Sequence, residues 1–245
     1  MHFQLEICCF DLPSVLIAQR AGAQRVELCA DPANGGTTPS LGLVRAARKE
    51  LEIALYPIIR ARGGDFLYSD EEFEIMLADI VHCKKAGCDG IVTGLLLSNG
   101  KVDKSRCKKI IHVAYPMGVT FHRAFDWTAN PFEALEDIIE LGFERILSSG
   151  QQPTAVEGIS LLADLVKQAD QRISIMPGSG VRSSNIIELA KITGAWEFHS
   201  SARSHRKTGM EFSNAMMRED QSIVLPSQDE VESMLAQLKK YFHQQ

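Results

Sequence analysis

Short runs of apolar residues alternate with longer amphipathic segments along most of this chain. Four of the runs occupy residues 3–8, 53–59, 118–121 and 173–176. Four more belong to a recurring segment, in which a glycine precedes a short turn and an apolar run that ends in a polar residue. These recurring segments are residues 21–28, 86–93, 141–148 and 193–200. Bounded apolar runs of this kind predict eight buried strands.

The amphipathic segments between the runs predict helices. The first begins near Asp11, with Pro13 in its opening turn, where a missing N–H is tolerated. The others span residues 40–50, 70–86, 103–115, 131–141, 155–169 and 183–192. Eight strands alternating with helices predict an α/β fold, a parallel sheet closed into a (β/α)8 TIM barrel, which commonly takes about 250 residues. A doubly wound open sheet is the alternative.

The alternation of apolar runs and amphipathic segments becomes less regular after the eighth predicted strand. Residues 200–225 are mostly polar, and Pro226 then precedes a final amphipathic helix at residues 229–242. We expect this helix to close the barrel or to contact another subunit. No linker or low-complexity segment is present. The sequence therefore predicts a single domain over residues 1–245, with the barrel in 1–200 and a closing segment with its extra helix in 201–245.

Composition narrows the class of protein. The chain has 245 residues, of which 45% are hydrophobic and 23% charged, which is typical of a soluble globular protein with a large core. A net charge of -5 disfavours nucleic acids and acidic membrane surfaces as partners. We find no signal peptide and no apolar stretch long enough to span a membrane. The six cysteines form no C-x-x-C pair and are expected to be reduced thiols in a cytosol.

Polar residues crowd the end of the fifth predicted strand. The apolar run at residues 118–121 is followed by His122, Arg123 and Asp126. An imidazole, a guanidinium and a carboxylate at one strand end are unfavourable unless they are paired or hydrated, and parallel barrels carry their chemistry at the strand ends. His122 and Asp126 are therefore candidate catalytic residues, with His122 as an acid or base. A salt-bridged strand end is the structural alternative.

The first two strands share a Glu-x-Cys pattern. Alternation along a strand puts Glu6 on the same face as Cys8, and Glu27 on the same face as Cys29. Neighbouring strands lie about 4.8 Å apart, so we expect the two thiols and the two carboxylates to approach one another inside the barrel. The glutamates are candidate catalytic bases.

Other strand ends carry residues suited to an anion. Arg60 and Arg62 follow the third strand, next to a Gly-Gly pair, and can pair with the buried glutamates or hold an anion bidentately. Glycine-rich turns after strands seven and eight are the usual phosphate seat of barrels, with plain tight turns as the alternative. The candidate anion-binding residues are Arg60, Arg62, Arg123, Ser179, Gly180, His199, Ser200 and Arg203.

Seven segments carry a resemblance to a known family. They are Leu5-Glu6-Ile7-Cys8, Arg25-Val26-Glu27-Leu28-Cys29, Gly35-Gly36-Thr37-Thr38-Pro39-Ser40, Arg62-Gly63-Gly64-Asp65-Phe66, Thr120-Phe121-His122-Arg123-Ala124-Phe125-Asp126, Pro177-Gly178-Ser179-Gly180 and Glu197-Phe198-His199-Ser200-Ser201-Ala202-Arg203. In these segments the chain resembles the CutC family of copper homeostasis proteins, from residue 5 to about residue 214. Ala61 departs from the family's usual proline, which should loosen its loop, and Ser148 stands where threonine is usual.

The resemblance implies a TIM barrel, a cytoplasmic location, a role in copper handling with Cu(I) as the ligand, and a homo-oligomer. Because thiolates select Cu(I), Cys8 and Cys29 are the candidate metal ligands, with Met176 as a candidate helper.

Two further interpretations stay open beside a copper-binding protein. One is an enzyme that performs acid–base chemistry on a small anionic or phosphorylated metabolite, with Glu6 or Glu27 as base and His122 assisting. The other places a divalent metal on Glu6, Glu27, His122 and His199, since oxygen and imidazole ligands suit manganese or zinc. The sequence alone does not decide whether the chain is an enzyme.

Overall fold

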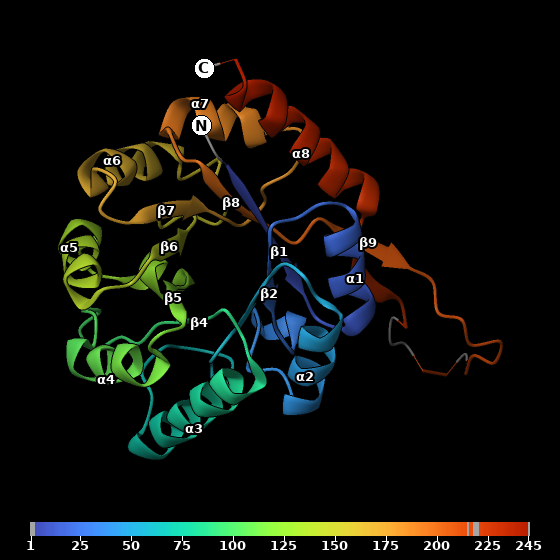
Figure 1. The fold of residues 1–245 in the computed structure, drawn as a ribbon, viewed down its shortest axis with the longest axis horizontal. Coiled ribbons are helices and arrows are strands. Elements are labelled where there is room, and N and C mark those ends of the chain that lie inside the picture. Colours follow the sequence, from blue (N-terminus) through green and yellow to red (C-terminus); the bar gives the residue numbers. More distant parts are fainter. Residues whose placement is uncertain (1–2, 215, 218–220, 245) are drawn as a thin grey trace.

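The computed structural model describes residues 3–214, 216–217 and 221–244; residues 1–2, 215, 218–220 and 245 of the predicted domain lie outside the described part. It confirms the predicted barrel: a ring of eight strands is surrounded by helices (Figure 1). The barrel strands are β1 (Gln4–Cys9), β2 (Arg25–Leu28), β3 (Ala54–Pro57), β4 (Gly90–Thr93), β5 (Gly118–Phe121), β6 (Arg145–Ser148), β7 (Ser174–Pro177) and β8 (Glu197–Ser200).

The strands pair in parallel throughout the barrel. One group runs β3-β2-β1-β8 and the other runs β4-β5-β6-β7. The two groups meet where the backbone N–H of Ile59 donates to the carbonyl of Val92 at 2.7 Å, and where β7 lies against β8. All eight carboxyl ends therefore open at the same end of the barrel.

The helices agree closely with the amphipathic pattern. They are α1 (Leu12–Arg20), α2 (Leu41–Glu50), α3 (Asp70–Ala86), α4 (Lys104–Ala114), α5 (Pro131–Leu141), α6 (Ile159–Ala169), α7 (Ile186–Thr193) and α8 (Gln228–Phe242). The Asp11 side chain caps α1 by accepting from the Ser14 N–H at 2.8 Å. Helix α6 begins at Ile159, later than the predicted residue 155, after a series of turns. Position 158 in the last of these turns requires glycine, since a Cβ there would meet the Ser149 carbonyl oxygen at 1.9 Å.

The segment after β8 contains a hairpin that the sequence did not predict. Strands β9 (Arg203–Arg206) and β10 (Ile223–Pro226) pair antiparallel, and β10 contacts α1 and β1. The first strand of the hairpin, β9, is polar and largely exposed, so the sequence shows no alternation of apolar and polar residues there. Helix α8 packs between α7 and α1 on the outside of the barrel and buries one apolar face (Figure 1). The ring of strands itself is closed by the pairing of β1 with β8.

Two short 3-10 helices complete the chain near the barrel mouth. They are η1 (Pro32–Asn34) and η2 (Arg123–Trp127), and η2 directly follows β5. Within the part of the chain that the structure describes, no helix is long and apolar enough to cross a membrane.

Candidate functional site

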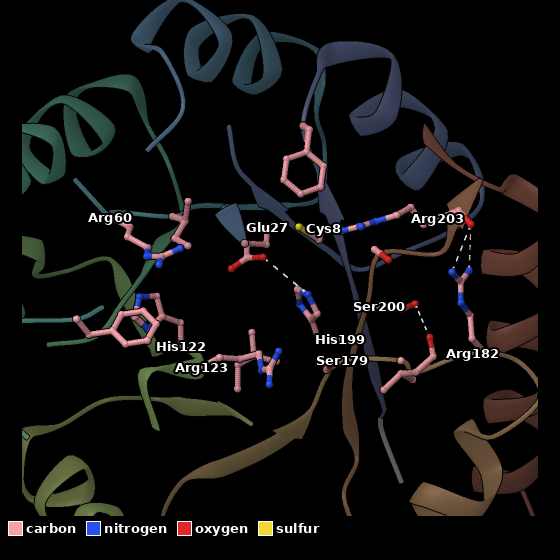
Figure 2. Close-up of a pocket in the computed structure, with 18 residues that line it drawn as sticks. Cys8, Glu27, Arg60, His122, Arg123, Ser179, Arg182, His199, Ser200 and Arg203 are labelled. Carbon is pink, nitrogen blue, oxygen red and sulfur yellow. Dashed lines mark hydrogen bonds and ion pairs between the residues drawn. The ribbon is translucent and has the colours of Figure 1, made fainter. Parts of the chain in front are cut away.

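A pocket of about 380 Å³ opens at the carboxyl ends of the barrel strands (Figure 2). Most of the predicted site residues line it. These are Cys8, Glu27, Arg60, His122, Arg123, Ser179, Gly180, His199, Ser200 and Arg203. Four predicted residues lie outside its lining: Glu6, Cys29, Arg62 and Asp126. The expectation that separate strand ends deliver polar side chains to one place is therefore confirmed for most of them.

The two thiols of the Glu-x-Cys pattern lie next to each other. Cys8 on β1 is opposite Glu27 in the strand register, and Cys29 directly follows β2. The Sγ atoms of Cys8 and Cys29 are 3.7 Å apart, as the alternation along the strands predicted. One donor atom from each of Cys8, Glu27 and Cys29 lies within 4.8 Å of the other two. These three residues form a group able to hold a metal ion.

The thiols differ in their affinity for a proton. A hydrogen bond from Cys29 outweighs the effect of burial and, with His199, lowers the pKa of Cys8 to about 5. Burial, together with the same hydrogen bond, raises the pKa of Cys29 well above its usual value. Near neutral pH, Cys8 is therefore a thiolate that accepts a hydrogen bond from the Cys29 thiol.

His199 on β8 joins this group to the carboxylates. Its Nδ1 is 2.7 Å from Glu6 Oε1, and its Nε2 is 3.8 Å from Glu27 Oε2. Burial by itself would lower the pKa of His199, but hydrogen bonds to Cys8 and Glu6 raise it well above its usual value. Burial and the nearby Cys8 charge raise the pKa of Glu27. The imidazole is thus a cation that bridges the barrel interior and the pocket.

Beneath the pocket lies a buried ionic cluster formed by Glu6, Arg25, Arg145 and Glu197. The Arg25 guanidinium pairs with Glu6 and contacts Glu197 Oε2 at 2.5 Å, while Arg145 Nε contacts the same oxygen at 3.0 Å. Burial opposes ionisation of Glu6, but the charges and hydrogen bonds of Arg25 and His199 together outweigh it, and the pKa of Glu6 falls to about 2. Each charge in the cluster therefore has an opposite charge beside it.

The prediction that Arg60 or Arg62 pairs with the buried Glu6 is wrong. Arg25 does so, because the register of β1 and β2 sets Arg25 directly opposite Glu6. Met176, the candidate helper for copper, is fully buried and accepts a hydrogen bond from Arg25 at 3.2 Å.

Arg60 follows β3 and is held by backbone oxygens. Its guanidinium donates to the carbonyls of Asn34, Gly36 and Gly64 at 2.6 to 3.0 Å, and it lies 4.9 Å from the centre of the Phe66 ring. Its Nε is buried without a hydrogen-bond partner among the described residues.

His122 at the end of β5 is a neutral hydrogen-bond donor. Its Nδ1 accepts from the Ala124 N–H at 3.2 Å, so Nε2 carries the proton of the neutral ring. Burial, with the nearby charge of Arg60, lowers the pKa of His122 to about 3. Gly94 makes room for the ring, since a Cβ there would meet Nδ1 at 2.6 Å. His122 therefore stays uncharged near neutral pH.

Asp126 and Arg62 form local contacts instead. Asp126 accepts from Ser148 Oγ at 2.6 Å, from backbone N–H groups of the following loop, and from Arg123 Nε at 2.8 Å. Arg62 pairs with Glu72 at 2.6 Å and with Asp65 at 2.9 Å. Asp126 thus stabilises the turn after β6 through hydrogen bonds, and Arg62 links its own loop to α3 through an ion pair.

The sequence reasoning missed several residues that shape this region. Arg182 lines the pocket, and its guanidinium donates to the backbone carbonyl of Arg203 at 3.3 Å. The Gly-Ser-Gly turn just before Arg182 was the available signal. For the cluster, the signal was Arg25, two residues before Glu27 and so on the same strand face.

Known proteins resemble the chain over most of its length. The model of the CutC family matches residues 3–204. A CutC family protein of Chromobacterium violaceum is 52% identical over 208 residues, covering 85% of this chain and 84% of the relative. The human copper homeostasis protein cutC homolog is 46% identical over 213 residues, covering 87% of this chain and 78% of the relative.

Solved structures confirm the architecture. CutC from Streptococcus agalactiae is 33% identical with a TM-score of 0.78, covering 81% of this chain and 98% of that one. A phosphoribosylanthranilate isomerase from Thermotoga maritima has a TM-score of 0.60 at 14% identity, covering 97% of this chain and 99% of that one. At that identity the likeness concerns the barrel and carries no function.

Proposed function

The chain belongs to the CutC family, and from that premise we propose that it is a cytoplasmic copper homeostasis protein that binds Cu(I) through Cys8 and Cys29. Its human and mouse relatives are named copper homeostasis proteins. The observation that carries the proposal is the 3.7 Å separation of the two Sγ atoms on neighbouring strands. Two sulfur ligands held this close bind a soft ion without rearrangement of the backbone.

The chemistry of the donor atoms favours a soft ion over a divalent one. Thiolates select Cu(I), whereas carboxylates and imidazoles suit manganese or zinc. Glu6 is already engaged by Arg25 and His199, so it is a poor ligand for the alternative divalent site. Glu27 adds one oxygen donor beside the sulfur pair.

The test is anaerobic titration of the purified protein with Cu(I) against a competing chelator, followed by ultraviolet absorption of the copper–thiolate bonds. We expect stoichiometric uptake by the wild-type protein and its loss in the Cys8→Ser, Cys29→Ser double variant.

A matched control removes another thiol pair. Cys83 on α3 and Cys88 hydrogen-bond to each other outside the pocket, so the Cys83→Ser, Cys88→Ser variant should keep its copper. Undiminished uptake by the Cys8, Cys29 double variant would show that the proposed ligands are wrong. No uptake by the wild-type protein would overturn the copper-binding function.

A further inference from the structure

The pocket is much larger than a metal ion requires. Its volume of about 380 Å³ falls within the roughly 300–1,000 Å³ typical of small-molecule sites. Cys8 and Glu27, two of the three residues able to hold a metal ion, occupy one part of its boundary, and arginines occupy much of the rest (Figure 2). The additional space and charge call for a second ligand.

The charges lining the pocket are unbalanced. Its lining contains the His199 cation, the Cys8 thiolate, Glu27 and four arginines, which are Arg60, Arg123, Arg182 and Arg203. Of these arginines, Arg123 pairs with a carboxylate, that of Asp126. Arg60 and Arg182 donate to backbone carbonyls, and across the described ranges no ion pair involves Arg60, Arg182 or Arg203. A neutral carbonyl leaves the guanidinium charge uncompensated.

Two buried donors on one wall also lack acceptors within the part of the chain that the structure describes. Arg60 Nε and His122 Nε2 have no hydrogen-bond partner there, although only 5% of Arg60 and 4% of His122 is exposed. They are close together, because both pack against Phe66, whose ring centre lies 4.9 Å from the guanidinium carbon and from the imidazole centre. Buried donors are nearly always satisfied in folded proteins. Because both atoms are shielded from solvent, a small shift of this wall would let them donate to an acceptor atom of a ligand.

The opposite wall adds two more cationic side chains. In Figure 2, Arg182 and Arg203 lie on the opposite side of the pocket from Arg60 and His122, and Ser200 lies near Arg182. The Arg203 side chain is exposed, and among the described residues no side chain forms an ion pair or hydrogen bond with its guanidinium. A ligand in the pocket would thus meet positive charge on both sides.

We propose that this pocket binds a small organic anion carrying a carboxylate or phosphate group, held by Arg60 and His122 on one wall and by Arg182 and Arg203 on the other. Guanidinium groups match both oxyanions with paired N–H donors, and a neutral imidazole adds a single donor. The site shares its boundary with the thiols but uses no sulfur atom, so anion binding is independent of copper.

The test is calorimetric titration of copper-free protein with inorganic phosphate and, separately, with citrate, at an ionic strength held constant with potassium chloride. We expect saturable binding of at least one probe, and the tighter one identifies whether phosphate or carboxylate is preferred. Absence of saturable binding for both probes overturns the proposal.

Variants locate the site. Arg182→Gln with Arg203→Gln should weaken the bound probe at least about tenfold, the loss expected for one charged hydrogen bond. The matched control is Arg172→Gln, an exposed arginine paired with Glu136 outside the pocket, which should leave affinity unchanged. Equal affinities of the double variant and the wild type for the probe would show that this wall does not bind the anion.

His122→Asn tests the other wall. The asparagine oxygen can replace Nδ1 as acceptor for the Ala124 N–H while the Nε2 donor is lost. We expect weaker binding with an unchanged unfolding midpoint at pH 7; unchanged affinity would exclude this donor. The Cys8→Ser, Cys29→Ser variant should still bind the anion, which separates this proposal from the copper function.

Discussion

The buried ionic cluster and the pocket above it contain the same kinds of side chain in opposite states. In the cluster, every guanidinium and carboxylate has a partner of opposite charge within the barrel. In the pocket, three of four arginines have no acidic partner among the described residues. Paired charges in a closed interior stabilise one arrangement of the strands, whereas unpaired cations in an open cavity are available to a ligand. Whether a charged side chain has an oppositely charged partner therefore distinguishes structural residues from ligand-binding ones better than its residue type does.

His199 lies at the boundary between these two regions. Its Nδ1 contacts Glu6 of the cluster, and its Nε2 faces Glu27 in the pocket. The ionic cluster therefore fixes the orientation of the ring that borders the thiols. A substitution in the ionic cluster should therefore also alter the surroundings of the Cys8–Cys29 thiol pair.

The largest effect should follow from breaking the cluster with Arg25→Gln. This change leaves Glu6 and Glu197 without their shared cation in a buried site, and we expect it to lower the free energy of unfolding by about 3–5 kcal/mol. Urea denaturation followed by circular dichroism measures the change. Arg172→Gln, which breaks an exposed and solvent-screened pair, should lower the same free energy far less. A similar small effect at Arg25 would mean that the cluster is not structural.

Lowering the pH from 7 to 5 should have an intermediate effect on stability, because His122 is neutral in the folded protein. Its pKa is lowered from 6.5 to about 3 in the folded protein, so between these values the unfolded chain binds more protons. This contribution to stability is complete above pH 6.5 and is lost as the pH falls, by roughly 2 kcal/mol at pH 5. The His122→Asn variant lacks this dependence.

Urea midpoints of both proteins at pH 7 and pH 5 provide the measurement. Comparing the two proteins removes the contribution of His199, whose pKa is shifted in the opposite direction. Parallel losses of stability in both proteins would contradict a buried neutral His122.

The smallest effect should come from Arg203→Gln. Because the Arg203 side chain is exposed and has no ion pair in the described part of the chain, we expect the free energy of unfolding to change by no more than about 0.5 kcal/mol. Thermal or urea unfolding at pH 7 measures this. A loss above about 2 kcal/mol would show that Arg203 supports the fold, and it would erase the contrast with Arg25.

The sequence was sufficient for the barrel and for the meeting of the thiols, since both follow from periodicity. Strand alternation put Cys8 and Cys29 on inward faces, and parallel pairing set them 3.7 Å apart. The hairpin of β9 and β10 gave no such pattern, because backbone pairing holds a mostly polar, exposed first strand there.

The partners of individual arginines could not be predicted from periodicity in the same way. Arg62 directly precedes a Gly-Gly pair and Arg182 closely follows a Gly-Ser-Gly turn. Arg62 nevertheless pairs with Glu72 in the first turn of α3, whereas Arg182 lines the pocket. Which acid lies within reach depends on how a helix packs against a loop, and one sequence carries little information about that contact. Arg25 was overlooked for a related reason, since the register between strands decides its partner.

The stacking of Phe3 on Phe242, with ring centres 5.7 Å apart, brings the beginning and the end of the chain together at the foot of the barrel. A short linker between these ends would make the backbone a continuous loop, which could then be cut at the exposed turn near residues 98–99. Such a permuted chain should refold, and fluorescent or affinity fusions attached on the side of Phe3 or of Phe242 should leave the mouth unobstructed.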